Sequence, residues 1–246
     1  MRLKGKTAII TGAASGFGAG IARKFAAEGA RVMVADINAD AARIVARDLG
    51  GIVQEVDVAD NSSVAAMAQA ALDQLGHVDI LVNNAGITHL PKPMEDVDEE
   101  EFDRVLAVNA KSVYLTARHL VAHMKARGAG AILNIASTAG LSPRPNLNWY
   151  NASKGWMITA TKTMAVELAP SGVRVNALCP VAGETPLLAS FMGEDTPERR
   201  AAFLSTIPLG RFSTPEDMGN AACFLCSGEA GMITGVAMEV DGGRCI

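Results

Sequence analysis

The sequence predicts an α/β protein whose doubly wound parallel sheet has seven strands and carries helices on both faces. Short Val-, Ile- and Ala-rich runs alternate with longer helical patterns, which is typical of repeated strand–helix units. The 246 residues are 49% hydrophobic and only 4% aromatic, so aliphatic side chains must fill the core, as in helices packed on a parallel sheet. No repeat, low-complexity tract or linker interrupts the pattern, and we expect a single domain over residues 1–246.

The strands and helices are predicted to alternate from the first residues onward. Seven apolar runs are expected to form the strands, at residues 7–11, 31–36, 51–57, 79–84, 130–137, 173–179 and 236–242. Helices are expected to begin near Gly16, Asn38, Asn61, Asp98, Trp149 and Pro215. Several of these starts have Asn, Asp or Thr as a suitable N-cap. The longest irregular segment, at about 181–200, follows the sixth strand at the sheet edge where ligands bind, and is a candidate substrate lid.

Charge and hydropathy argue against two classes of partner. The formal net charge is −4 and no long block of Lys and Arg occurs, so neither nucleic acid nor an acidic membrane surface is expected as a partner. The first residues lack the apolar core and cleavage site of a signal peptide, and no apolar run approaches the length of a bilayer span. We therefore expect a cytoplasmic protein that acts on a small molecule.

Neither the cysteines nor the histidines predict a metal or redox site. The four cysteines are too few and too unevenly placed for a disulfide framework, and they are Cys179, Cys223, Cys226 and Cys245. Cys223 and Cys226 form a CxxC, but its flanks read as an amphipathic helix with no second Cys/His pair, which predicts two buried thiols. His119 and His123 share a helix face without a third ligand in the sequence, so a helix surface or a subunit contact is expected.

A glycine-rich loop, TGAASGFG at 11–18, lies between the first predicted strand and the first predicted helix. Gly12 and Gly16 can adopt backbone conformations closed to other residues and let a pyrophosphate approach, whereas Gly18 allows close helix–strand packing. The start of the helix presents free N–H groups and the positive end of its dipole to phosphates. The spacing is GxxxGxG rather than GxGxxG, so it is the position of the loop that predicts a dinucleotide site.

Asp36 ends the second predicted strand, where an acid meets the adenosine ribose in dinucleotide folds. A carboxylate there accepts hydrogen bonds from both ribose hydroxyls and repels a 2′-phosphate, which favours NAD(H) over NADP(H). Three positions that would supply a phosphate-binding cation are uncharged, namely Ala13, Ala14 and Ile37. Arg31 and Arg43 lie nearby in sequence.

A tyrosine and a lysine stand four positions apart in YNASK, so Tyr150 and Lys154 share one face of a predicted helix. A neighbouring ammonium favours the phenolate and lowers a pKa that is ordinarily about 10. Such a tyrosine can exchange a proton with an alcohol or carbonyl oxygen near neutral pH. Ser137 ends the fifth predicted strand at the ligand-binding edge and can donate a hydrogen bond to the same oxygen.

With these residues in place, the chain resembles the short-chain dehydrogenase/reductase family over essentially its whole length. The matching pieces are TGAASGFG (11–18), Asp57 in VDVAD, NNAG (83–86), Asn109 in VNAKS, Ser137 in NIASTAG, YNASK (150–154), RVNALCP (174–180) and MEVDGG (238–243). The resemblance implies a Rossmann-type sheet and hydride transfer between nicotinamide C4 and a carbinol carbon. It also implies a homotetramer in which the helices after Asp98 and Trp149 pack against their mates.

The resemblance further implies a role for each matching residue. Tyr150 would be the general acid/base, Lys154 would depress its pKa and hold the nicotinamide ribose, and Ser137 would fix the substrate oxygen. Asn109 would complete a proton relay through water to Lys154. Asp57 and Val58 would meet the adenine. The residues expected to contact the cofactor are Gly12, Ser15, Gly16, Phe17, Gly18, Asp36, Ile37, Asp57, Val58, Asn83, Ala85, Gly86, Tyr150, Lys154, Pro180 and Thr185.

The chain departs from the family pattern after Pro180, where PVAGET replaces the common Pro-Gly that is followed shortly by a branched residue and Thr. Thr185 keeps its place and could bond the carboxamide or the pyrophosphate, but the backbone before it must run differently. Glu184 is expected to be a solvated loop acid rather than a substrate contact. Arg144 and His89 fall in loops that border the predicted pocket, and either could hold an anionic or hydroxylated substrate.

We therefore expect an NAD(H)-dependent oxidoreductase that interconverts a secondary alcohol and its ketone. The family implies substrates such as sugars and polyols, cyclic or aryl alcohols, or hydroxyacyl compounds. One alternative is an NADPH-dependent 3-oxoacyl thioester reductase on the same fold. A second alternative, from another class, is a catalytically silent dinucleotide-binding protein, although such a protein has no reason to keep Ser137, Tyr150, Lys154 and Asn109 together.

Overall fold

One parallel sheet of seven strands organises the protein, whose computed structural model describes all 246 residues. The strands are β1 (Thr7–Thr11), β2 (Arg31–Asp36), β3 (Ile52–Glu55), β4 (Ile80–Asn83), β5 (Gly130–Ile135), β6 (Val173–Pro180) and β7 (Ala237–Val240). Their order is β3-β2-β1-β4-β5-β6-β7, and every neighbouring pair is parallel. The chain order reverses beside β1, which defines a doubly wound, Rossmann-type sheet and confirms the predicted fold class.

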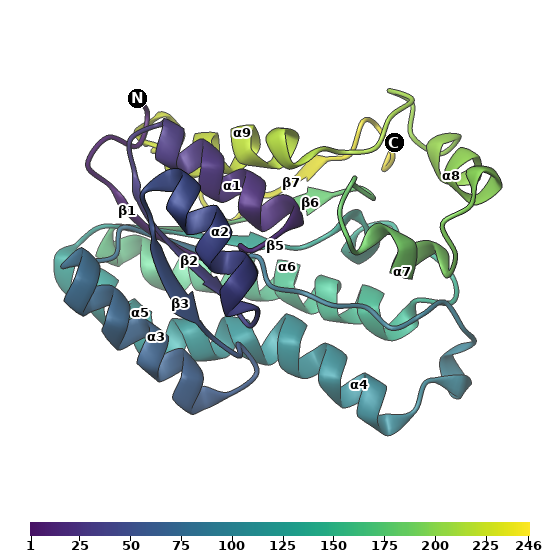
Figure 1. Cartoon of the computed structure of the whole chain (residues 1–246), viewed down its shortest axis with the longest axis horizontal. Helices are drawn as coiled ribbons and strands as arrows, with labels where there is room; N and C mark the ends of the chain where they lie inside the picture. The colour runs from purple at the N-terminus through teal and green to yellow at the C-terminus, as the bar shows by residue number, and fades with distance from the viewer.

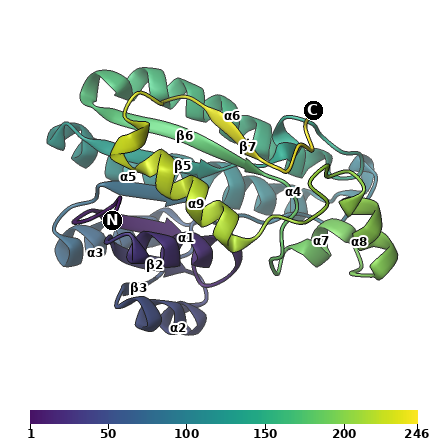
Figure 2. The ribbon, with the colours of Figure 1, turned by 90° about the horizontal axis from the view of Figure 1, so that it is seen from above.

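Helices cover both faces of this sheet, as Figures 1 and 2 show from two directions. They are α1 (Gly16–Ala27), α2 (Ala39–Leu49), α3 (Asn61–Leu75), α4 (Glu99–Leu106), α5 (Ser112–Arg127), α6 (Asn148–Leu168), α7 (Leu188–Met192), α8 (Pro197–Leu204) and α9 (Pro215–Cys226). One face carries α1, α2 and α9, and the other carries α3, α5 and α6. No helix combines the length and the apolar character that crossing a bilayer requires.

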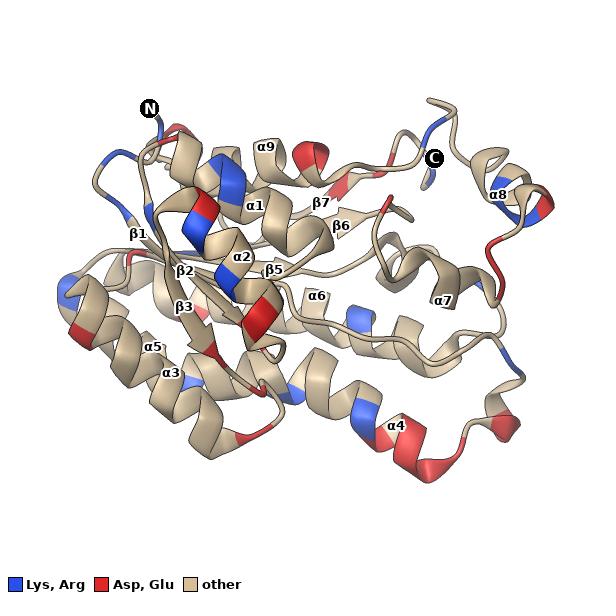
Figure 3. Ribbon diagram, viewed as in Figure 1, with Lys and Arg blue, Asp and Glu red and all other residues tan.

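Side-chain caps explain why the helices begin close to their predicted starts. Asn38, Asp60 and Asp98 each accept a hydrogen bond from the backbone N–H three residues later, at 3.0, 2.7 and 2.8 Å. Thr214 and Asp217 cap each other's backbone at the start of α9. The acidic first turn of α4 also lies at the positive end of its helix dipole (Figure 3).

Four strands end earlier than predicted, and in two of them, β3 and β5, the polar residue at the predicted end bonds to a nearby backbone N–H instead of continuing the ladder. The strand predicted at 51–57 ends at Glu55, and Asp57 accepts a hydrogen bond from the N–H of Ala59 at 2.9 Å. The strand predicted at 130–137 ends at Ile135, and Ser137 caps the short 3₁₀ turn η3 (Thr138–Gly140). Both polar residues are thereby turned out of the sheet at its carboxyl edge.

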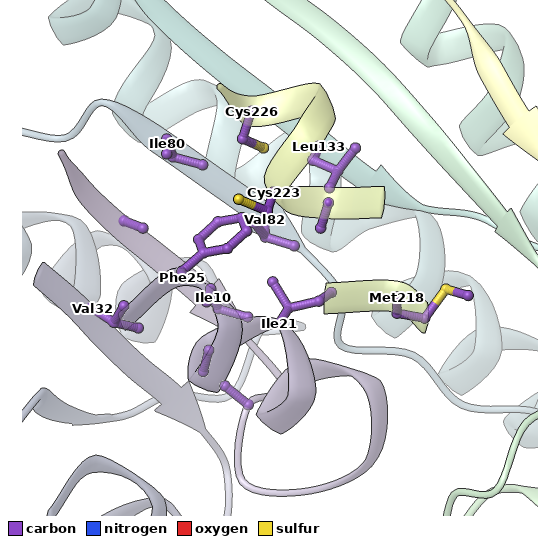
Figure 4. Close-up of a cluster of buried hydrophobic side chains, with 14 of the residues drawn as sticks. Ile10, Ile21, Phe25, Val32, Ile80, Val82, Leu133, Met218, Cys223 and Cys226 are labelled. Carbon is purple, nitrogen blue, oxygen red and sulfur yellow. The ribbon is translucent and has the colours of Figure 1, made fainter. Parts of the chain in front are cut away.

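The core lies in two layers, one on each face of the sheet. Figure 4 shows the layer under α1 and α9, where Phe25 packs among Ile10, Val82 and the thiols of Cys223 and Cys226. Burial raises the pKa of the Cys226 thiol to about 12 and also raises that of Cys223. Both cysteines are free and buried, in agreement with the prediction of two buried thiols on a helix.

The segment predicted as an irregular loop at 181–200 instead contains α7 and the first half of α8. Leu188 and Met192 of α7 are buried against Val181 and Phe212, so apolar side chains hold the segment in place. Thr196 then caps α8, accepting a hydrogen bond from the backbone N–H of the third residue after it. The two short helices were not predicted because the segment is rich in Gly, Pro and acidic residues, which are typical of loops.

Candidate functional site

A cavity of about 450 Å³ lies at the carboxyl ends of the central strands, where the strand order reverses. Most of the residues expected to serve catalysis or cofactor binding line it, namely Gly12, Ser15, Gly16, Phe17, Asp36, Ile37, Asp57, Val58, Ala85, Gly86, Ser137, Tyr150, Lys154, Pro180 and Thr185. Gly18, Asn83 and Asn109 do not line it. The structure therefore brings the two sequence signals, the glycine loop and the Tyr–Lys helix, to one cavity.

The glycine loop between β1 and α1 is shaped for close approach. Gly12 and Gly16 both have left-handed backbone conformations, with φ of 62° and 52°. A Cβ on Gly12 would lie 2.8 Å from the Cα of Ala85, and one on Gly18 would lie 2.2 Å from the carbonyl oxygen of Gly12. Gly18 thus serves helix–strand packing, while the open loop and the helix start form a cradle that fits the pyrophosphate of a dinucleotide.

Asp36 lies at the end of β2 beside this loop, and its carboxylate joins two segments. One oxygen accepts a hydrogen bond from the N–H of Ala14 and the other from the N–H of Asn38, both at 2.9 Å. Arg43 pairs with an acid one turn earlier on α2, and Arg31 donates to a backbone carbonyl of α3 at 3.0 Å. Neither arginine lines the cavity, so this end of it carries negative charge.

The two asparagines of NNAG lie on different sides of the cavity wall, and Asn83 is not where it was expected. Asn83 was expected along the cofactor, but its amide is buried under the sheet edge, donating to Asn134 at 2.8 Å and accepting from Thr116 at 2.9 Å. Asn84 lines the cavity instead and donates to both backbone carbonyls of residues 11–12, at 2.8 and 2.9 Å. The reason is that Asn83 is the last residue of β4, with its side chain on the interior face.

Tyr150, Lys154 and Ser137 meet at the opposite end of the cavity. Tyr150 and Lys154 lie one turn apart on α6, and the Lys154 Nζ is 5.9 Å from the centre of the phenol ring. The ammonium donates to the carbonyl of Ile135 at 2.8 Å, which fixes it against the end of β5. Ser137 follows two residues later, and its hydroxyl accepts from the N–H of Ala139 at 3.1 Å.

Burial dominates the protonation of this group. It raises the pKa of Tyr150 to about 12, more than the neighbouring Ser137 hydroxyl and the charge of Arg144 lower it. Burial also lowers the pKa of Lys154 to about 8. The sequence led us to expect that Lys154 would lower the pKa of the phenol. In the structure the pKa of Tyr150 is raised instead, because burial is the largest effect on it. The reason is that the phenol is 4% exposed, and a phenolate there loses its hydration.

Asn109 lies beside this group in a turn of π-helix, Ala107–Lys111, which interrupts the single helix expected after Asp98 and separates α4 from α5. Its side chain bonds both backbone groups of Ile87 at 2.9 Å and donates to Ser153 at 3.0 Å. A Cβ on Gly86 would lie 3.4 Å from both the Asn109 Oδ1 and the Lys154 Nζ. The two polar atoms therefore flank the same point, although Asn109 itself is behind the cavity wall.

Three residues that the sequence analysis did not assign to the site help to shape it. A Cβ on Gly140 would lie 2.8 Å from the backbone carbon of Lys154, so this glycine lets the turn after Ser137 touch α6. The Phe191 ring of α7 meets the Tyr150 ring edge-on, with centroids 5.1 Å apart. Asn151, which had no role in the sequence analysis, donates to the backbone carbonyl of the loop residue Arg144 at 2.7 Å.

The segment after β6 covers the glycine loop. Thr185 lies so close that a Cβ on Gly16 would be 3.2 Å from its side chain. Glu184 pairs with Arg200 at 3.3 Å and does not line the cavity, as expected for a solvated loop acid. His89 does not line the cavity; it is buried and bonds the carbonyl of Leu90 at 2.8 Å.

The histidine pair of α5 does not form a ligand set. His119 bonds Asn61 at 3.0 Å, whereas His123 accepts from the N–H of Val78 at 3.3 Å. The structure contains no group of three or more His, Cys, Asp and Glu side chains that could hold a metal ion.

The fold and this cavity define a Rossmann-type α/β protein that presents a glycine cradle and a Tyr–Lys helix at one sheet edge. The chain belongs to the short-chain dehydrogenase/reductase family. A family model described as enoyl-(acyl carrier protein) reductase matches residues 12–244. Relatives over the length of the chain are named as dehydrogenases, which makes the chain an oxidoreductase acting on hydroxyl groups, in a family that binds NAD(P)(H).

Several relatives cover the whole chain. A 4-formylbenzenesulfonate dehydrogenase from Comamonas testosteroni is 50% identical over 100% of both chains, and a cis-4-hydroxycyclohexanecarboxylate dehydrogenase from Sinomonas cyclohexanicum is 37% identical over 97% of this chain and 96% of its own. A solved structure of a 3-ketoacyl-(acyl-carrier-protein) reductase from Brucella melitensis complexed with NADH is 51% identical, with a TM-score of 0.95 over 99% of this chain and 100% of that one.

Proposed function

We propose that the protein is an NAD(H)-dependent dehydrogenase that interconverts a secondary alcohol and its ketone. The observation that carries this proposal is the convergence of Ser137, Tyr150 and Lys154 at one end of a cavity whose other end is the glycine cradle and Asp36. A dinucleotide that spans the cavity would place its reactive ring beside the phenol. The residues expected to contact it are those that line the cavity, with Asn84 in place of Asn83.

Tyr150 is the proton-transfer residue in this proposal. Its hydroxyl exchanges a proton with the substrate oxygen, and the Ser137 hydroxyl donates a hydrogen bond to that same oxygen. When bound, the nicotinamide accepts or donates the hydride. Lys154 holds a positive charge at the edge of the phenol, and Asn109 lies where a water could link Lys154 to solvent. The segment at 181–200 closes the site as a lid, with Phe191 against the phenol.

Asp36 supports NAD(H) as the cofactor. Its two oxygens are anchored by backbone N–H groups, so the carboxylate cannot swing away from an incoming ribose. No cation lines this end of the cavity to receive a 2′-phosphate. The remaining lone pairs can accept hydrogen bonds from ribose hydroxyls.

The substrate class is proposed to be a ring alcohol. Two relatives that match the full chain are named for ring compounds, a formylbenzenesulfonate and a hydroxycyclohexanecarboxylate. The aromatic ring of Phe191 beside Tyr150 provides an apolar wall for such a ring. The second candidate is an NADPH-dependent 3-oxoacyl thioester reductase. The relative from Brucella melitensis is named for a reductase of this kind, but its structure contains NADH.

A homotetramer is also proposed, with α5 and α6 in the subunit contacts. The outer surfaces of these helices expose Tyr114, Trp156 and Val166, at 53, 44 and 79%. Exposed large apolar side chains on these two helices support a contact surface there.

Initial rates with both cofactors test the proposal. Reduction of NAD⁺ and of NADP⁺ is followed at 340 nm with 1-phenylethanol and with cis-4-methylcyclohexanol, and the reverse reaction is followed with a 3-oxoacyl thioester. We expect turnover of a ring alcohol with NAD⁺ at a kcat/KM at least about tenfold above that with NADP⁺. Faster reduction of the thioester with NADPH would replace this proposal by the second candidate.

A further inference from the structure

Arg144 is a cation at the substrate end of the cavity that has no partner within the protein. It lies in the loop between η3 and α6 and lines the cavity together with Tyr150. Its guanidinium makes no hydrogen bond and no ion pair, and the titratable groups that act on it are Arg244 and Tyr150, with no carboxylate among them. Burial and the repulsion from Arg244 lower the pKa of Arg144.

Arg144 is the one arginine that lines the cavity; Arg244, which repels it, has no ion-pair partner either but does not line the cavity. Each of the following has a carboxylate oxygen within ion-pair distance: Arg199, Arg200 and Arg211. Three acids of the covering segment, Glu184, Glu194 and Asp195, pair with Arg200 or Arg199. No carboxylate of the segment is among the groups that act on Arg144. The segment that covers the site therefore offers Arg144 no counter-charge.

The position of Arg144 is held by apolar and backbone contacts. Its guanidinium lies over the ring of Phe203 in α8, 4.4 Å from the centroid. The side chain of Asn151 on α6 donates to the backbone carbonyl of Arg144 at 2.7 Å. These contacts orient the guanidinium without using its N–H groups, so its planar fork of five donors is available to a ligand.

A cation that is half-buried and unpaired is costly unless something negative joins it. A guanidinium matches a carboxylate or a sulfonate, because both present two oxygens to its parallel N–H groups. The cavity ends in Asp36 and Asp57 at the adenosine side and in Lys154 and Arg144 at the substrate side, so the cofactor's own phosphates are expected at the glycine loop and not at Arg144. The partner of Arg144 must then come with the substrate.

We infer that Arg144 is the specificity residue for an organic anion, and that the substrate is a ring alcohol that carries a carboxylate or a sulfonate. This inference rests on the proposed function. The carbinol lies at Tyr150, the ring packs against Phe191, and the acid group forms a paired contact with Arg144. The charge of Arg144 also lowers the pKa of Tyr150, so the anchor and the phenol are in electrostatic reach of each other.

The test compares matched alcohols on the wild type and on three variants. The anionic substrates are 4-(1-hydroxyethyl)benzoate and 4-(1-hydroxyethyl)benzenesulfonate, and the neutral ones are the methyl ester of the former and 1-(4-methylphenyl)ethanol. Arg144→Gln removes the charge, Arg144→Lys keeps it without the fork, and Arg23→Gln removes an exposed charge on the far side of α1. The quantity compared is the ratio of kcat/KM for an anionic substrate to that for its neutral match.

We expect the wild type to favour the anionic substrates, with a ratio of about 10 to 100, since a charge-assisted bond lost to a neutral group costs that much in binding. Arg144→Gln brings the ratio to about one, Arg144→Lys gives an intermediate ratio, and Arg23→Gln leaves it unchanged. Any effect of Arg144→Gln on the pKa of Tyr150 acts on both substrates and cancels in the ratio. Comparison of kcat/KM for the benzenesulfonate and the benzoate shows which acid group fits Arg144 better.

The inference is overturned if the wild-type ratio of kcat/KM for anionic and neutral substrates is near one, or if Arg144→Gln does not change that ratio. Turnover of the neutral alcohols would still leave the proposed function standing. An absence of turnover with all four alcohols would overturn both. As a readout apart from turnover, toluene-4-sulfonate is expected to inhibit oxidation of the neutral alcohol competitively in the wild type and about tenfold less well in Arg144→Gln. Equal inhibition would count against the anion site.

Discussion

The backbone N–H of Ala14 donates a hydrogen bond of 2.9 Å to the carboxylate of Asp36, which ties the glycine loop to the end of β2. One side chain thereby shapes the loop proposed to hold the pyrophosphate and supplies the negative charge proposed to exclude a 2′-phosphate. The loop and the charge are coupled, so a change at Asp36 affects the choice of cofactor through both.

Asp36→Asn is expected to weaken the preference for NAD⁺. The amide keeps one oxygen for the Ala14 N–H, but it loses the hydrogen bond from the Asn38 N–H and the charge that repels a phosphate. Removal of one such repulsion near the protein surface is worth about 1 to 2 kcal/mol, so the ratio of kcat/KM for NADP⁺ to that for NAD⁺ is expected to rise about tenfold. The measurement is initial-rate kinetics with both cofactors and one alcohol.

The control for this change is Asp73→Asn, which removes an exposed acid from α3. It is expected to leave the cofactor ratio as in the wild type. Equal ratios in the wild type and in Asp36→Asn would mean that Asp36 does not set the cofactor preference.

Lys154→Met is expected to stabilise the folded protein at pH 7 while it abolishes turnover. Burial lowers the pKa of Lys154 from 10.5 to about 8, so in the folded state the buried ammonium is unfavourable at neutral pH. The unfolded chain binds the proton more tightly, and the stability of the wild type therefore rises with pH between about 8 and 10.5. At pH 7 the variant gains about 1 to 2 kcal/mol, after allowance for the lost hydrogen bond to Ile135.

This effect is measured by urea unfolding of wild type and variant at pH 7 and at about pH 9.5. The difference in their free energies of unfolding is expected to narrow at the higher pH, because the wild-type lysine loses its proton. Lys162→Met, at an exposed position of the same helix, is the matched control and is expected to leave the pH dependence unchanged. A variant less stable than the wild type at pH 7 would show that Lys154 contributes to folding as well as to the site.

Gly140→Ala is expected to disturb the site without touching any of its polar groups. The added Cβ would lie 2.8 Å from the backbone of Lys154 and 2.9 Å from that of Gly155, which forces η3 and α6 apart. Such overpacking costs about 1 to 3 kcal/mol of stability. Because Ser137 starts the same turn, we also expect a lower kcat with a near-wild-type KM for NAD⁺.

Gly228→Ala provides the comparison, since nothing lies within 4 Å of the position of its Cβ. Thermal unfolding and steady-state rates of both variants are measured together. If Gly140→Ala and Gly228→Ala have the same unfolding temperature and the same kcat, the close packing of Gly140 against α6 does not matter for stability or turnover.

The doubly wound parallel sheet and the site at its carboxyl edge could be predicted because they follow from local patterns. Apolar runs separated by helical segments lead to a parallel sheet, and polar residues such as Ser137 and Asp36 at strand ends must then meet at one edge. Asn109 was anticipated only through the family resemblance. The π-turn that positions it has no pattern in the sequence.

The parts that could not be predicted depend on long-range packing. Whether Asn83 or Asn84 faces the cavity depends on where β4 ends, and a shift of one residue exchanges the two sides of a strand. The helices α7 and α8 are held by contacts with Phe212, which lies beyond the segment itself. The raised pKa of Tyr150 comes from its burial, and spacing to Lys154 alone indicated the opposite direction.

Proton transfer by Tyr150 is the central claim, and Tyr150→Phe tests it most directly. The phenyl ring keeps the edge-on contact with Phe191 and removes only the hydroxyl, so the fold and the cofactor site should persist. We expect NADH binding, followed by the change in its fluorescence on titration, to match the wild type within about twofold. In the same preparation kcat for alcohol oxidation is expected to fall by about 10³-fold or more. A variant that binds NADH normally and still oxidises the alcohol at the wild-type rate would contradict the account.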